Sequence, residues 1–572
     1  MQGFTANTDF SELQSTMRAI ELASASIQMQ INPAASEAIV LALGQSSQPY
    51  KTCQFILENS LVATARFQAA AAIREAAIRE WGFLNADDKK SLISFCLCYA
   101  MQHASSPDSY VQAKVSSVAA QLMKRGWLEE VAAEKETLFY QVNQAILGIH
   151  GVDVQFAGIK FLESLVSEFS PSTSSAMGLP REFHEQCRRS LERDYLKTFY
   201  QWTQEAASSV TNRIIESESV VPEVKVCTAA LDLMLQILNW DFRSNTSDTK
   251  INLFSAGVRQ DGDSLKRSDC HLVQFSREGY WLDCAIAVST RKLIVQLCSL
   301  TGTVFPSDDG KMHERHLLQL LSGILEWVDP PDAVSKAIEN GKSDSEMIDG
   351  CRALLAIANV TTPYVFDNLL KSMRAIGTFT FLSMWMSEVI KVLITSNTEE
   401  ETWSWEARDI LLDTWTALLM PINTTTVNTL LPPEGIKAAA NLFGFIVECE
   451  LRMASASAFN DEGDSDYLRA SVSAMDERLS SYALIARASI DVTIPLLTSV
   501  FSERVTRLNQ GRGVIDLTET LEELYSLLLI IGHVIADEGE GEMPLVPNAI
   551  QTQFVANSVE ADKHPVILLS RY

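Results

Sequence analysis

Glycine and proline are scarce in this sequence, with 25 glycines and 17 prolines among 572 residues. Both residues interrupt regular helices, and their shortage leaves few places where a helix must stop. The apolar positions are dominated by Ala, Leu and Ile, with few of the Val/Thr alternations that mark strands. The sequence therefore predicts helix almost throughout.

Positive charge is also in short supply, because 46 basic residues face 72 acidic ones and the formal net charge is −26. Proteins that wrap duplex nucleic acid or bind anionic membranes need clustered Lys and Arg. We therefore expect no direct nucleic-acid contact. A protein partner with a basic face is the natural complement, and the alternative is that acidity only keeps a large protein dispersed.

The sequence lacks paired cysteines and long hydrophobic runs. Its ten cysteines do not have the spacing of a disulfide framework, which favours reduced thiols in the nucleus or cytosol. The N-terminus has no basic-then-apolar leader, and the most apolar run, Leu524 to Ala536, is interrupted by Ser526 and His533. We interpret that run as a buried helix and expect no membrane insertion.

Catalytic motifs are missing as well. The sequence contains no P-loop, dinucleotide-binding glycine pattern, nucleophile elbow or HExxH, and its eight histidines are dispersed. The nearest approach to a metal set is Cys270, His271 and Cys284 with His313 and His316, whose spacing fits no standard zinc site. We expect no catalytic residue, no metal and no cofactor, and an enzyme is the most distant alternative.

Length and landmark residues point to a repeat. A chain of 572 residues exceeds what one hydrophobic core usually spans, while 47% apolar and 21% charged residues are typical of a folded protein. Bulky aromatic residues recur at predicted helix ends, at Trp81, Trp127 and Phe169, 46 and then 42 residues apart. This is the period of HEAT-type helix pairs. The sequence predicts an all-α solenoid, a right-handed superhelix of about a dozen such pairs.

The helix expected from Arg66 to Trp81 shows how a solenoid helix is buried. One apolar stripe contains Phe67 and Trp81, and a second contains Ala69, Ala72, Ile73 and Ala76. A helix buried on two sides can pack against its pair partner and against the next repeat. We therefore expect Phe67 and Trp81 to be structural residues.

Three short blocks carry a resemblance to a known family. Cys53 to Ser60 (CQFILENS), Arg66 to Ile73 (RFQAAAAI) and Arg79 to Trp81 (REW) together resemble the importin N-terminal domain of the importin-β (karyopherin) superfamily. Further blocks, strongest up to about residue 245, resemble the exportin-4 family within it: 124–126, 165–170, 182–187 and 238–242.

This resemblance implies a nuclear export receptor and not an enzyme. Members of the family bind the GTPase Ran in its GTP form through the first helix pairs, take up protein cargo with it, and contact Phe-Gly repeat proteins of the nuclear pore. They shuttle between nucleus and cytoplasm, and the cargoes associated with the exportin-4 family are a hypusine-bearing translation factor and certain transcription regulators. The alternative from another class is a static HEAT-repeat scaffold without GTPase coupling.

The expected organisation follows from the same resemblance and from the breaks in helical pattern. Residues 1–148 form N-terminal HEAT repeats that resemble the Ran-binding domain, residues 149–242 continue them, and residues 243–269 form a polar loop. Residues 270–541 are further HEAT repeats, and residues 542–572 are an irregular tail. Because family members are longer and the chain stops in an apolar run, we expect it to be truncated.

The candidate contact residues for Ran are the cations near the predicted Ran-binding helices. They are Arg66, Arg74, Arg79, Lys114, Lys124 and Arg125. The alternative is that they are a solvated strip. Reversing Arg74 and Arg125 together is expected to weaken Ran-GTP binding far more than stability. Four tryptophans form a dense aromatic region for which core packing is expected, with grooves for pore-repeat Phe side chains as the alternative: Trp385, Trp403, Trp405 and Trp415.

Overall fold

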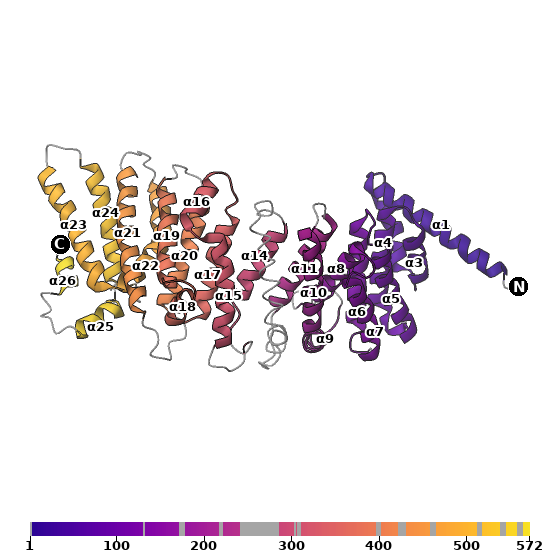
Figure 1. Cartoon of the computed structure of the whole chain (residues 1–572). Coiled ribbons are helices and arrows are strands. Elements are labelled where there is room, and N and C mark those ends of the chain that lie inside the picture. Colours follow the sequence, from indigo (N-terminus) through magenta and orange to yellow (C-terminus); the bar gives the residue numbers. More distant parts are fainter. Residues whose placement is uncertain are drawn as a thin grey trace. The chain divides into compact units, whose positions relative to one another are not determined.

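The chain consists of two compact units of helices, Met1–Ser268 and Asp269–Tyr572. The computed structural model describes residues 3–129, 132–170, 178–216, 221–240, 285–301, 305, 311–395, 402–420, 431–457, 465–511, 517–537, 545–556 and 564–571. The expected polar loop at 243–269 lies outside these residues. Each unit is a stack of helix pairs (Figure 1).

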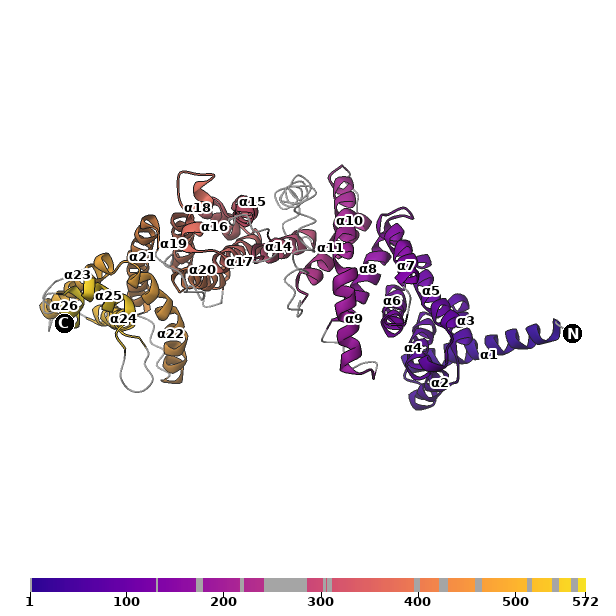
Figure 2. The same cartoon turned by 90° about the horizontal axis from the view of Figure 1, so that it is seen from below.

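The N-terminal unit is built from antiparallel pairs in two layers. The helices are α1 (Gly3–Gln28), α2 (Pro33–Gln45), α3 (Tyr50–Asn59), α4 (Ala63–Glu80), η1 (Trp81–Phe83), α5 (Ala86–Gln102), α6 (Ser109–Gly126), α7 (Ala132–Ile146), α8 (Val152–Phe169), α9 (Arg181–Asp194), α10 (Leu196–Glu216) and α11 (Val221–Leu238). One layer is a continuous row in which α2, α4, α6, α8 and α11 each pack on the next. The other layer holds their pair partners α1, α3, α5, α7 and α10 (Figure 2).

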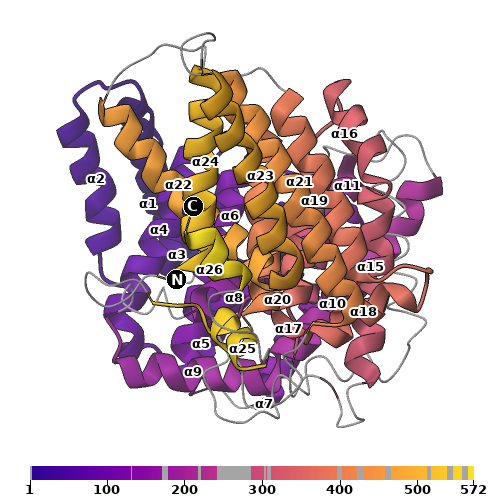
Figure 3. The same cartoon turned by 90° about the vertical axis from the view of Figure 1, so that its left-hand side faces the viewer.

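The second unit repeats this two-layer plan. Its helices are α14 (Ala285–Cys298), α15 (Lys311–Val328), α16 (Pro331–Glu339), α17 (Ser345–Val360), α18 (Pro363–Lys371), α19 (Thr378–Thr395), α20 (Trp403–Leu419), α21 (Pro433–Ser457), α22 (Ser465–Arg487), α23 (Ile490–Gly511), α24 (Thr518–Ile535), α25 (Asn548–Ala556) and α26 (Pro565–Ser570). One row runs through α14, α17, α20, α22 and α24. In the other layer, α19 and α21 lie side by side (Figure 3).

The predicted fold class, an all-α solenoid of HEAT-type helix pairs, is confirmed. Within the described residues the only β pairing is an isolated bridge between Asp537 and Leu545. The tail at 542–572, expected to be irregular, contains the short helices α25 and α26, and α26 packs on α23. Helix pairs stacked in rows bury apolar surface between neighbours, so the core extends along each unit.

The aromatic landmarks mark helix ends as predicted. Trp81 follows the last residue of α4, Trp127 follows α6, and Phe169 is the last residue of α8. All three are buried, at 4%, 0% and 2% exposure. Trp127 lies edge-on to Phe139 and Phe169, at 6.2 and 4.8 Å between ring centroids. The buried ring of Trp127 therefore joins the end of α6 to α7 and α8.

Helix α4 is buried on two sides, which confirms the two-stripe interpretation. Its buried residues are Ala65, Ala69, Ala70, Ala72, Ile73, Ala76 and Ala77. Phe67 differs from expectation, because it is only half-buried and packs against Tyr110 of α6 at 5.9 Å between ring centroids. Small alanines let α2 and α6 pack closely on α4, and Phe67 packs on the first turn of α6.

Ion pairs, one of them buried, connect the row helices of the second unit. Arg291 of α14 is fully buried, and its Nε lies 3.0 Å from Oδ2 of Asp349 in α17. Asp349 also accepts from Arg352 at 2.9 Å, and Arg352 reaches Glu406 of α20 at 2.6 Å. A buried charge is tolerated only when it is paired. The buried pair of Arg291 and Asp349 therefore helps to specify how α14 and α17 align, while the exposed pair of Arg352 and Glu406 adds a weaker link to α20.

Candidate functional site

The six candidate cations lie on two neighbouring row helices of the N-terminal unit. Arg66, Arg74 and Arg79 belong to α4, and Lys114, Lys124 and Arg125 belong to α6. Helices α4 and α6 pack directly against each other. The structure thus places all six cations on adjacent helices. Four of them bind groups within the chain, and two have no salt-bridge partner among the described residues.

Arg79 is a cap for the neighbouring helix. Its Nη1 donates to the carbonyl oxygen of Gly44 and its Nη2 to that of Ser46, both at 2.8 Å. It also pairs with Glu80 at 2.8 Å. The last carbonyls of a helix have no partner within the helix and carry its negative dipole end, so a cation there is stabilising. The charge of Arg79 is therefore engaged at the C-terminus of α2.

Arg125 caps the C-terminus of α4 in the same way as Arg79 caps α2. Its Nη2 donates to the carbonyl oxygen of Ile78, near the end of α4, at 2.8 Å. The side chain is half-buried, and this burial lowers the pKa of the guanidinium. Removing it would leave a carbonyl at the α4 terminus without this donor. Arg125 therefore serves mainly to connect α6 to the end of α4 in the preceding repeat.

Lys124 is the most deeply buried of the six, with 1% of its side chain exposed. Its ammonium donates to the backbone carbonyl of Glu168 at the end of α8 and lies 3.7 Å from the Glu168 carboxylate. It also lies 5.5 Å from the ring centroid of Phe169. Burial lowers the pKa of Lys124 and raises the pKa of Glu168. This pair joins α6 to α8 inside the core.

Arg66 pairs with Asp108, the residue before α6, at 2.5 Å, and only 11% of its side chain is exposed. The ion pair anchors the start of α6 to the start of α4. Arg66, Arg79, Lys124 and Arg125 thus bind groups within the chain, and we leave these four out of the proposed partner contact.

Arg74 and Lys114 are differently placed. Arg74 is half-buried, and it makes neither a hydrogen bond nor an ion pair with any residue that the structure describes. The Nζ of Lys114 lies 5.3 Å from the ring centroid of Phe67 and is likewise without an ion pair in the described chain. Burial, and then the charge of Arg74, lower the pKa of Lys114. Two adjacent cations without a salt-bridge partner favour an anionic group from outside.

The tryptophan region is mostly core. Trp385 and Trp415 are fully buried, which confirms core packing for these two. Trp403 is half-buried, and Trp405 is 42% exposed with the guanidinium carbon of Arg408 at 4.8 Å from its ring centroid. The buried rings offer no open groove for a Phe side chain.

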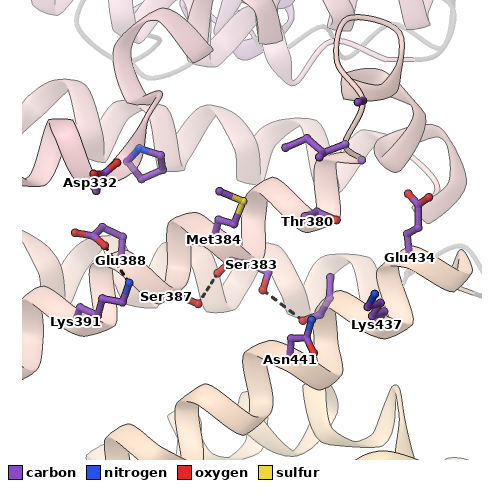
Figure 4. A pocket seen from close by; sticks show the side chains of 15 residues that line it. Asp332, Thr380, Ser383, Met384, Ser387, Glu388, Lys391, Glu434, Lys437 and Asn441 are labelled. Carbon is purple, nitrogen blue, oxygen red and sulfur yellow. Dashed lines mark hydrogen bonds and ion pairs between the residues drawn. The ribbon is translucent and has the colours of Figure 1, made fainter.

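An open groove does lie between α19 and α21. It encloses about 780 Å³ and is lined by α16, residues 375–377, α19 and α21. Met384 of α19, 54% exposed, projects into it beside Thr380 and Ser383 (Figure 4). Ile376 and Ala438 add further apolar surface.

The charged groups at the rim of this groove are mostly satisfied within the chain. Glu388 accepts from Ser335 at 2.9 Å and pairs with Lys391 at 3.5 Å. Glu434 pairs with Lys371 at 2.7 Å. The groove therefore suits an apolar side chain better than a charged one. Sequence patterns did not reveal it, because four separate segments supply its walls.

The metal and membrane alternatives gain no support from the described residues. His313 and His316 pack on the ring of Phe305, at 4.8 and 5.3 Å between ring centroids, and Cys270, His271 and Cys284 lie outside the described chain. No group of three His, Cys, Asp or Glu residues that could hold a metal ion occurs among the residues described. Among the residues that the structure describes, α19 is the one straight helix that is long and apolar enough to cross a membrane, and it packs against α20 and α21.

Comparisons with known proteins find that the chain is similar to proteins named Exportin-4. Residues 12–268 match the family model described as Exportin-4. A curated relative, "Exportin-4" from Dictyostelium discoideum, is 22% identical over 578 aligned positions that cover 90% of this chain and 49% of the relative. The chain thus spans about half the length of the relative that it matches.

Solved structures with a similar succession of helices include importin beta, at 11% identity, covering 91% of this chain and 68% of that one with a TM-score of 0.27. Another is SYS-1, at 11% identity, covering 87% of this chain and 93% of that one with a TM-score of 0.25. At these TM-scores the assignment of the fold rests on the helix pairs described above.

Proposed function

We propose that the chain is a nuclear transport receptor of the exportin-4 type, within the karyopherin superfamily, and that it binds Ran-GTP through its N-terminal unit. The observation that supports this most is the family match over residues 12–268, which includes both α4 and α6. Within them, Arg74 and Lys114 are the candidate cations without a salt-bridge partner in the described chain. Acidic side chains of Ran would complete their ion pairs.

The proposed mechanism is coupling between ligands and requires no active site in this chain. Ran-GTP and a protein cargo would each favour the same spacing of the repeats, and thermodynamic reciprocity then makes each ligand tighten the binding of the other. Hydrolysis of GTP on Ran in the cytoplasm would release both. The receptor would therefore shuttle between nucleus and cytoplasm. The family association suggests a hypusine-bearing translation factor as one cargo.

A comparison of the two nucleotide forms of Ran tests this function. The purified chain should retain Ran loaded with a non-hydrolysable GTP analogue at least about tenfold more than Ran-GDP, a difference of about 1.4 kcal/mol in binding free energy. Surface plasmon resonance with either form immobilised measures it. Equal binding, or none, would instead favour the static scaffold.

We further propose that the groove between α19 and α21 binds Phe side chains of the Phe-Gly repeat proteins of the pore. A Met384→Glu variant places a charge on its apolar wall and should weaken binding of a Phe-Gly repeat peptide about tenfold, because an unpaired charge beside a buried ring is costly. Fluorescence anisotropy measures this. Met420→Glu is the matched control, since Met420 is 59% exposed and is not among the groove residues. Equal loss in both variants would contradict the proposal.

A further inference from the structure

A second groove lies in the N-terminal unit, between α2 and α4. It encloses about 590 Å³. Small side chains form much of its surface, with Ala34 and Ala38 from α2 and Ala71 and Ala72 from α4. Ile27 of α1 and Leu41 of α2, the latter 54% exposed, add larger apolar surface. Alanines on both facing helices leave room for an apolar side chain from outside.

Two carboxylates line this groove without a salt-bridge partner. They are Glu37 of α2 and Glu75 of α4, and neither makes a hydrogen bond or an ion pair with the part of the chain that the structure describes. An arginine four residues after a glutamate on a helix normally pairs with it. Arg79 stands in that position after Glu75, but its guanidinium binds the carbonyls of Gly44 and Ser46 and the carboxylate of Glu80. The capping of α2 therefore leaves Glu75 without its usual partner.

Glu37 and Glu75 are both exposed, and Glu75 lies close to the end of α2. Its carboxylate lies over the last turn of α2, where a Cβ added to Gly44 would meet Oε2 at 2.4 Å. The C-terminus of a helix carries partial negative charge, which disfavours a carboxylate and favours a cation. Lys114 of α6 interacts with Glu75 electrostatically without forming an ion pair. The groove thus combines an apolar surface with two carboxylates that make no ion pair with the described residues.

From this we propose that the α2–α4 groove is a docking site for a short protein segment in which an apolar side chain is flanked by Lys or Arg. The apolar side chain would lie on the alanines, and the cations would pair with Glu37 and Glu75. Gln68, which also lines the groove, would offer its amide to the backbone of the segment. This ligand has the opposite charge from the one that suits Arg74 and Lys114, so the site goes beyond the proposed Ran contact.

The test uses a defined probe, a fluorescein-labelled peptide with two leucines flanked on each side by two lysines. Its binding to the 572-residue chain is followed by fluorescence anisotropy. We expect saturable binding that weakens about tenfold in the Glu37→Gln/Glu75→Gln variant. Lys114→Met should instead strengthen binding a few-fold, because it removes a cation that competes for Glu75. A peptide with serines in place of leucines should bind at least about tenfold more weakly.

A matched variant separates a real site from attraction to an acidic chain. Glu12→Gln/Glu58→Gln removes two exposed carboxylates of the same unit that do not line the groove. Unchanged binding in this control supports the site, whereas equal weakening in both double variants overturns it. Ran-GTP binding should be retained in Glu37→Gln/Glu75→Gln. Peptide binding to the groove and Ran-GTP binding to the proposed contact are thereby measured independently.

Discussion

Reversing Arg74 and Lys114 together, as Arg74→Glu with Lys114→Glu, is expected to weaken Ran-GTP binding by at least about a hundredfold, or about 2.8 kcal/mol. Two attractive contacts would each become a repulsion between like charges, which costs several kcal/mol across an interface. Isothermal titration calorimetry measures the affinity. The melting temperature should change by only a few degrees, because the described structure contains no hydrogen bond or ion pair of either side chain to lose.

Two further variants make this expectation specific. Arg181→Glu/Arg189→Glu on α9 applies the same change of net charge at side chains that are 82% and 74% exposed, and it should leave Ran binding nearly intact. Arg125→Glu should lower the melting temperature, because its donation to the Ile78 carbonyl is lost. If the α9 variant loses affinity as much as the α4 and α6 variant does, general electrostatic attraction and not a local contact explains the binding.

The second large effect concerns the buried pair of Lys124 and Glu168. Lys124→Met should cost about 3–5 kcal/mol of unfolding free energy, because removing one partner leaves the other charge buried and uncompensated. The carbonyl of Glu168 would also lose its donor. Urea unfolding followed by circular dichroism measures the loss. Replacing both residues, Lys124→Met with Glu168→Leu, should recover much of it, since an apolar pair can substitute for a buried ion pair.

The loss of unfolding free energy in Lys124→Met should depend on pH in a definite direction. Burial raises the pKa of Glu168 in the folded chain above its ordinary value, and Lys124 opposes this increase. A carboxyl whose folded pKa is raised favours folding below its unfolded pKa, and that contribution is lost as the pH rises through the folded pKa. The deficit of Lys124→Met relative to the parent chain should therefore shrink as the solution is acidified. A deficit that is constant with pH would show that lost packing, and not the charge of Glu168, causes the instability.

Helix positions could be predicted from the sequence because they depend on local patterns. The start of α5 shows the limit of precision: Asn85, Asp87 and Asp88 are all residue types found at helix starts, and the structure shows that Asn85 is the cap, because its Oδ1 accepts from the Asp88 amide at 2.8 Å. The repeat ends at Trp81 and Trp127 were found because a large aromatic residue at a regular interval is visible without knowledge of neighbours.

The roles of the candidate cations could not be predicted in the same way. Arg79 and Arg125 bind carbonyls that are 35 and 47 residues away in sequence, and a carbonyl carries no residue-specific signal. Only the packing of one row helix on the next shows that Arg79 and Arg125 are bound to backbone carbonyls. Arg74, in contrast, makes no hydrogen bond or ion pair with the described residues. The groove between α19 and α21 was missed for the same reason, since it exists only after distant segments have packed together.

The cations that cap neighbouring helices also constrain how the N-terminal unit can bend. Arg79 binds the end of α2, Arg125 the end of α4 and Lys124 the end of α8, always at the C-terminal end of a row helix. Arg66 and Asp108 also connect the N-terminal ends of α4 and α6, so this pair of row helices is tied at both ends. The tie from Arg79 to α2, in contrast, lies at the C-terminal ends of α2 and α4. A change in curvature would therefore move the N-terminal ends of α2 and α4 relative to each other more than those of α4 and α6. Fluorophore pairs at the N-terminal ends of α2 and α4 would report bending better than pairs at the N-terminal ends of α4 and α6.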